Sequence, residues 1–114
     1  MSTATLNVIE AAELATRLER RERFEFWNVL TDDYFKNEMI PGSRRVPLDL
    51  VGREAALRAL PKDTPIVVYC AGPTCPQSRL AAEKLARLGF TRVAAYEGGI
   101  EDWKRLGRSV VPSA

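Results

Sequence analysis

The chain has 114 residues, enough for one ordinary domain with a hydrophobic core, and 46% of its residues are hydrophobic. Lysine and arginine number 17 and aspartate and glutamate 15, which is too balanced for a protein whose main role is binding nucleic acid. Histidine is absent, which excludes Ser-His-Asp and Cys-His catalysis and zinc sites with imidazole ligands. We therefore expect a single globular domain over residues 1–114, with no nucleic-acid partner.

The first half of the chain alternates strand-like and helix-like patterns. After a short apolar stretch at residues 6–9, apolar residues recur at helical spacing over residues 11–18. Aromatic and β-branched residues predict a strand at 24–30, and Thr31 begins a short capped helix that ends before the Pro-Gly turn at 41–42. A short extended piece follows at 46–48, and Asp49 can cap a helix whose apolar positions extend to Leu60.

The second half contains the clearest strand, at residues 66–69. This strand is continuously apolar, which is typical of a central parallel strand covered on both faces. Ser78 is the expected N-cap of a helix over residues 79–88, and Gly89 suits its left-handed C-terminal position. A strand at 93–96, a glycine turn and a helix at 100–106 complete the chain. The alternation predicts an α/β fold: a mostly parallel sheet with helices on both faces.

The chain contains two cysteines, Cys70 and Cys75, too few for a four-thiolate zinc site or a disulfide framework. We therefore expect no structural metal site. The first residues have neither the basic nor the apolar segment of a signal peptide, and the longest strongly apolar run, 66–71, is too short to span a membrane. We expect a cytoplasmic protein without a membrane partner, whose thiols stay reduced.

Cys70 stands at the carboxyl end of the predicted central strand, where open parallel sheets bind their ligands. The loop after it is bent by glycine and proline and can direct several backbone N–H groups at one point. The next helix adds positive potential there. Both effects predict a lowered pKa for Cys70 and a site for an anion. The alternative interpretation is that Cys70 is a small buried residue, Cys75 an inert loop thiol and Arg79 a solvated helix residue.

Several segments, taken together and in order, resemble the rhodanese-like domain family. They are Ile-Pro-Gly-Ser at 40–43 with Val-Pro-Leu at 46–48, Ile-Val-Val-Tyr-Cys at 66–70, residues 81–90, and Tyr-Glu-Gly-Gly-Ile-Glu-Asp-Trp at 96–103. The resemblance covers essentially the whole chain. It implies a compact α/β domain with a mostly parallel five-stranded sheet, and a catalytic Cys70 that carries sulfur as a persulfide.

The loop departs from the usual pattern of that family. It is longer than the typical active-site loop, lacks the family's arginine and contains a second cysteine, as in one rhodanese-like subgroup. Asn28 and Met39 replace the usual aspartate and histidine at two mainly structural positions. We assign substrate binding to residues of the loop and of the first helical turn: Ala71, Gly72, Pro73, Thr74, Cys75, Gln77, Ser78 and Arg79. The second thiol, Cys75, could also act as a resolving thiol.

The resemblance predicts a sulfurtransferase, which needs no metal or organic cofactor. The Cys70 thiolate would take the outer sulfur of thiosulfate or a similar small anionic donor, and a thiol or cyanide would accept it. Cys75 could form a disulfide with Cys70, either after oxidation or by attack on the persulfide. One alternative is a non-catalytic interaction or redox-sensing module on the same scaffold. Another is a cysteine-based phosphatase or arsenate reductase, although residues 71–78 lack the arginine that binds an oxyanion bidentately.

Overall fold

The computed structural model describes residues 7–113. In this part of the chain, five strands form one sheet in the order β1-β5-β4-β2-β3, and every neighbouring pair is parallel. The α/β prediction is therefore confirmed, with a sheet that is parallel throughout. The strands are β1 (Asn7–Val8), β2 (Glu25–Asn28), β3 (Arg44–Arg45), β4 (Ile66–Tyr69) and β5 (Val93–Tyr96).

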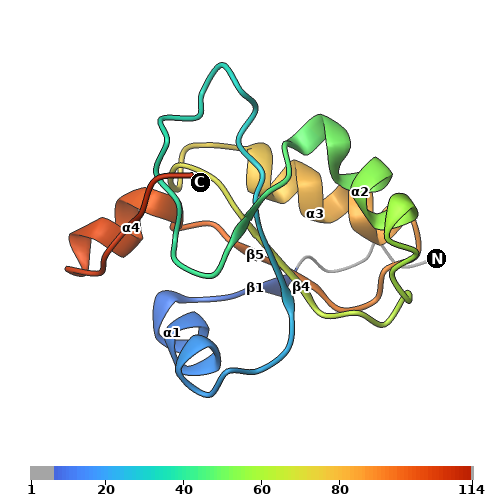
Figure 1. The fold of residues 1–114 in the computed structure, drawn as a ribbon, viewed down its shortest axis with the longest axis horizontal. Helices are drawn as coiled ribbons and strands as arrows, with labels where there is room; N and C mark the ends of the chain where they lie inside the picture. The colour runs from blue at the N-terminus through green and yellow to red at the C-terminus, as the bar shows by residue number, and fades with distance from the viewer. Residues whose placement is uncertain (1–6, 114) are drawn as a thin grey trace.

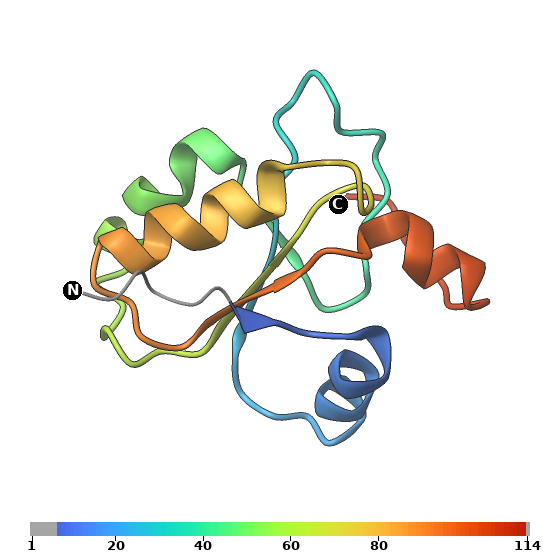
Figure 2. The same cartoon turned by 180° about the vertical axis from the view of Figure 1, so that it is seen from behind.

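Helices cover both faces of the sheet (Figure 1). Helices α1 (Ala11–Glu19) and α4 (Gly99–Arg105) pack on one face. The other face carries α2 (Val51–Leu57), which follows the 3-10 turn η1 (Leu48–Leu50), and α3 (Gln77–Arg87), as the reverse view in Figure 2 also shows. The described helices are all short, and none has the length and apolar character needed to cross a membrane.

Strand β4 is buried along its whole length because it supplies both cores. Its side chains alternate between the faces, so that Val68 packs on the α2 and α3 side while Val67 and Tyr69 pack on the α1 and α4 side. Tyr69 pairs in register with Asn28 of β2 and with Tyr96 of β5. The carboxyl ends of these three strands therefore lie at one edge, and the loops that follow them meet there.

A hydrogen-bond network ties neighbouring loops to this edge. The Tyr69 hydroxyl accepts the N–H of Ile40 at 2.9 Å and lies 2.6 Å from the hydroxyl of Ser43. The side-chain oxygen of Asn28 accepts the N–H of Leu30 at 3.1 Å, which turns the chain as it leaves β2. Burial of Tyr69 raises its pKa, so the phenol stays neutral and can serve in this structural network.

Two helix predictions are wrong in detail. The helix expected after Thr31 is only a turn, because Asp32 pairs with the Arg45 guanidinium at 2.8 Å and that group stacks on Phe35, 4.1 Å from the ring centre. These side-chain contacts hold residues 31–38 in an irregular path. Ser78 does not cap α3, which already begins at Gln77. The helix stop at Gly89 is confirmed, with φ of 103°.

Candidate functional site

Cys70 is fully buried at the carboxyl end of β4, as its position after the central strand predicts. Its thiol donates a hydrogen bond to the carbonyl oxygen of Cys75, with 3.5 Å between sulfur and oxygen. The N–H of Cys75 in turn donates to the carbonyl of Gly72 at 3.0 Å, which closes a tight turn. The loop therefore folds back over the sulfur, and the resting thiol is shielded from solvent.

The surroundings of Cys70 raise its pKa to about 11. Burial is the largest cause, because the thiolate loses its hydration, and pairing with the Cys75 thiol adds to it. The hydroxyl and the amide of Ser78 act in the opposite direction, since both are donors toward a thiolate. The sequence-based prediction of a lowered pKa is therefore wrong for this conformation, because the burial of the sulfur outweighs the donors that Ser78 supplies.

Ser78, expected as a helix cap and a substrate-binding residue, lies next to the Cys70 sulfur. It is the second residue of α3, fully buried, and its hydroxyl oxygen makes no hydrogen bond with any residue in the described part of the chain. A buried polar group without a partner is uncommon. Because this hydroxyl faces the Cys70 sulfur, it is available as a donor to a thiolate or to a sulfur adduct on that residue.

The other predicted binding residues are only partly brought together. Ala71 borders a cavity and Gly72 is buried beneath α4, whereas Pro73 and Thr74 are exposed on the outside of the loop. The Gln77 amide instead joins α3 to the loop after β2. Its oxygen accepts the Thr31 N–H and its nitrogen donates to the Thr31 hydroxyl, both at 3.0 Å.

Arg79 also points elsewhere than expected. It pairs with Glu97 after β5 at 3.0 Å, and its side chain is 60% exposed. An exposed ion pair of this kind contributes little to stability. In this conformation the guanidinium is directed at a carboxylate and does not contribute to binding an anion at the Cys70 loop.

Helix α4 begins directly against the cysteine loop. The N–H of Ile100 donates to the Cys70 carbonyl at 3.0 Å, and the N–H of Glu101 donates to the Ala71 carbonyl at 2.8 Å. Gly99 makes this approach possible, because its φ is 63° and a Cβ there would lie 2.8 Å from the Ala71 carbonyl carbon and the Gly72 nitrogen. The glycine turn seen in the sequence is thus the joint between α4 and the loop.

The close contact at Gly99 predicts that alanine substitutions at Gly99 and Gly107 differ greatly in their effect on stability, although both residues have positive φ. Gly99→Ala should destabilise the fold by about 2–4 kcal/mol, since it combines left-handed backbone strain with a backbone clash. Gly107→Ala, at φ 79° with no atom within 4 Å of the added Cβ, should cost only about 1–2 kcal/mol. Urea unfolding of the two variants measures the difference, and equal losses would contradict a close approach at Gly99.

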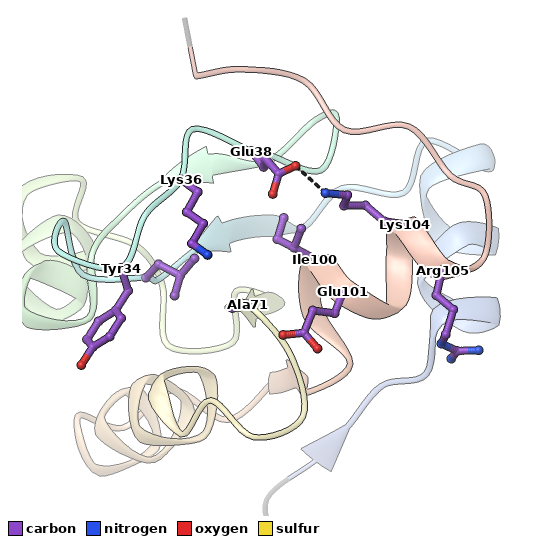
Figure 3. Close-up of a pocket in the computed structure, with 9 residues that line it drawn as sticks. Tyr34, Lys36, Glu38, Ala71, Ile100, Glu101, Lys104 and Arg105 are labelled. Atoms are coloured by element: carbon purple, nitrogen blue, oxygen red, sulfur yellow. Dashed lines mark hydrogen bonds and ion pairs between the residues drawn. The ribbon is translucent and has the colours of Figure 1, made fainter.

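A cavity of about 530 Å³ lies beside the loop and α4 (Figure 3). At the edge of this cavity, the carboxylate of Glu101 lies against Gly72, and a Cβ on Gly72 would be 2.6 Å from the Glu101 Cδ. Sequence reasoning gave no role to Glu101, although it lies in the motif at 96–103, nor to the charged residues opposite it, which come largely from the irregular segment after β2. The cavity is lined by Leu30, Tyr34, Lys36, Glu38, Ala71, Ile100, Glu101, Lys104 and Arg105.

Comparison with known proteins defines the class of this chain. A family model described as the Rhodanese-like domain matches residues 10–106. The chain therefore belongs to the rhodanese-like domain family, as its sequence motifs suggested. No curated protein sequence matches it.

Solved structures show the same fold. The BH2092 protein from Bacillus halodurans is 30% identical, with a TM-score of 0.81 over 93% of this chain and 77% of that one. The rhodanese-like domain of the Alr3790 protein from Anabaena is 31% identical, with a TM-score of 0.77 over 96% of this chain and 81% of that one. Thiosulfate sulfurtransferase from Pseudomonas aeruginosa is 26% identical, with a TM-score of 0.79 over 96% of this chain but only 21% of that protein. These similarities support a sulfurtransferase-like family.

Proposed function

We propose that this protein is a sulfurtransferase that carries sulfane sulfur as a persulfide on Cys70. The observation that carries the proposal is the Cys70 thiol at the carboxyl end of β4, facing a buried Ser78 hydroxyl that has no partner among residues 7–113. The family assignment and the similarity to a thiosulfate sulfurtransferase support the same chemistry. The reaction needs no metal or organic cofactor.

The reaction proceeds in two balanced steps. The Cys70 sulfur attacks the outer sulfur of thiosulfate, the sulfur–sulfur bond of the donor breaks, and sulfite leaves with its electron pair. The thiol proton is lost to solvent before the attack, so the product is the persulfide anion. Cyanide or a thiolate then attacks the outer persulfide sulfur, and Cys70 departs as a thiolate that is reprotonated. Donation from the Ser78 hydroxyl stabilises the anionic sulfur in both steps.

The resting loop must open before a donor can reach the sulfur. In the resting state the Cys70 thiol is fully buried and donates to the Cys75 carbonyl. Moving residues 72–75 removes this acceptor and admits solvent, and both changes lower the pKa of Cys70 toward that of a free thiol. Opening thus couples access to activation, as in other enzymes whose loops gate the site.

A phosphatase or arsenate reductase is a weaker alternative. Oxyanion chemistry at a cysteine loop requires a bidentate arginine, and residues 71–78 contain none. The next cation along the chain, Arg79, already pairs with Glu97. An assay with an aryl phosphate distinguishes this reading, and we expect no turnover.

Intact-mass measurement tests the proposal directly. After incubation with thiosulfate the protein should gain one sulfur atom, and cyanide should remove it. The Cys75→Ser variant should load equally well, because the persulfide is assigned to Cys70. A protein that gains no sulfur from thiosulfate or from a polysulfide donor would be a non-catalytic module of the family.

Cys75 is proposed as the resolving thiol, since it lies in the same loop and its carbonyl oxygen is 3.5 Å from the Cys70 sulfur. Its sulfur would attack the inner sulfur of the Cys70 persulfide, forming a Cys70–Cys75 disulfide and releasing hydrogen sulfide. The loaded parent protein should then release sulfide on standing, whereas loaded Cys75→Ser should keep its sulfur. Equal retention by both would remove Cys75 from the site.

A further inference from the structure

The cavity beside the cysteine loop has an unusual charge arrangement. Two of its cations already have carboxylate partners, because Lys104 pairs with Glu38 at 2.6 Å and Arg105 pairs with Asp102. Two opposite charges are left without an ion pair in the described part of the chain, Lys36 and Glu101. The cavity therefore presents one available cation and one available anion.

These two charges come from separate elements on either side of an apolar floor. Figure 3 shows Lys36 extending into the cavity from the segment after β2, while Glu101 extends from the first turn of α4. Ala71 and Ile100 lie between them. Cys70 does not itself line the cavity, but Ala71 directly follows it, so the cavity borders the loop that covers the sulfur.

On the basis of the proposed function, we infer that this cavity binds a small zwitterionic thiol, an amino acid or short peptide, as the sulfur acceptor. Its ammonium group meets the Glu101 carboxylate and its carboxylate meets the Lys36 ammonium. The volume of about 530 Å³ lies within the range of roughly 300–1,000 Å³ that is usual for small-molecule sites. Glu101 also repels dianions such as thiosulfate, so a zwitterion with one charge of each sign is the better match.

The acceptor step balances without any further reactant. The acceptor thiolate attacks the outer sulfur of the Cys70 persulfide, and the bond from that sulfur to Cys70 breaks. Cys70 leaves with the electron pair and takes up the proton that the acceptor thiol lost. The products are the free Cys70 thiol and the acceptor persulfide.

Three thiols that differ only in their charged groups test this inference. Cysteine carries both charges, cysteamine lacks the carboxylate, and 3-mercaptopropionate lacks the ammonium. Single-turnover discharge of the loaded protein is followed by intact mass, and each rate is expressed as variant over parent so that intrinsic thiol reactivity cancels. Glu101→Gln should slow cysteine and cysteamine by about fivefold and spare 3-mercaptopropionate, whereas Lys36→Gln should slow cysteine and 3-mercaptopropionate and spare cysteamine.

Charged residues that do not line the cavity provide matched controls. Glu22→Gln and Lys84→Gln make the same changes in net charge and should alter no rate ratio. If both cavity variants change all three thiols equally, or none of them, the inference is wrong.

A binding measurement separates this inference from the sulfurtransferase proposal. S-methylcysteine has both charges but no thiol, and its titration should shift the backbone amide resonances of Ala71 and Ile100 in the parent but not in the double variant Lys36→Gln/Glu101→Gln. Saturable binding by a parent that never loads sulfur would overturn the proposed activity and leave the zwitterion site standing. Normal loading without such binding would overturn the site alone.

Discussion

Replacing Cys70 by serine is expected to reduce sulfur transfer from thiosulfate to cyanide to the uncatalysed rate, a loss of about a thousandfold or more. A hydroxyl at this position is similar in size to the thiol but cannot form a persulfide. Steady-state thiocyanate formation measures the rate, and intact mass should show no added sulfur on the variant.

The Cys75→Ser variant is the matched control, since it removes a thiol from the same loop without removing the proposed nucleophile. It should keep turnover with cyanide within a few fold of the parent. Both variants should show the parent's cooperative urea unfolding, because serine fits either site. Persulfide formation in Cys70→Ser, or its loss in Cys75→Ser alone, would show that Cys70 is not the nucleophile.

The sequence was sufficient to predict the fold and the position of Cys70 at the end of a central strand, because both depend on local patterns. The continuous apolar run of β4 identifies a central parallel strand, and the chemistry of such a sheet lies at the carboxyl ends of its strands. The motif around Gly99 likewise indicated a turn before the last helix. The sequence did not indicate that Gly99 also contacts the Cys70 loop, because that contact joins segments that are distant in the chain.

The electrostatic state of the site was not predictable from the sequence. A glycine- and proline-bent loop before a helix suggested N–H donors around the sulfur, yet the loop closes with the Cys75 carbonyl facing it. The direction of the Cys75 carbonyl depends on the dihedral angles of the loop, and the sequence is compatible with more than one set of these angles. Glu101 and Lys36 were missed for a related reason, because an exposed charge on a helix or an irregular segment is usually only solvated.

The raised pKa of Cys70 predicts a steep pH dependence of its reaction with iodoacetamide. With a pKa of about 11, the thiolate fraction rises about tenfold for each pH unit, so alkylation of Cys75→Ser should increase roughly a hundredfold between pH 7 and pH 9. The alkylation rate has the same dependence on pH if the loop must open before Cys70 can react. The buried thiol remains the main species, and the open thiolate is in equilibrium with it, so its amount increases in proportion to hydroxide concentration.

The same shift affects stability, and its sign follows from the direction of the shift. The folded protein holds the Cys70 proton more tightly than the unfolded chain, whose thiol has a pKa near 8.5. Stability is therefore complete below about pH 8.5 and falls as pH rises toward 11, by about 3 kcal/mol in total. Urea unfolding of Cys75→Ser at pH 7 and pH 10 should show the beginning of this loss. The double variant Cys70→Ser/Cys75→Ser should lack the Cys70 contribution, because serine does not titrate in this range. If the alkylation rate levels off near pH 9, and both variants lose the same stability between pH 7 and pH 10, the buried thiol that donates to the Cys75 carbonyl is not the main state in solution.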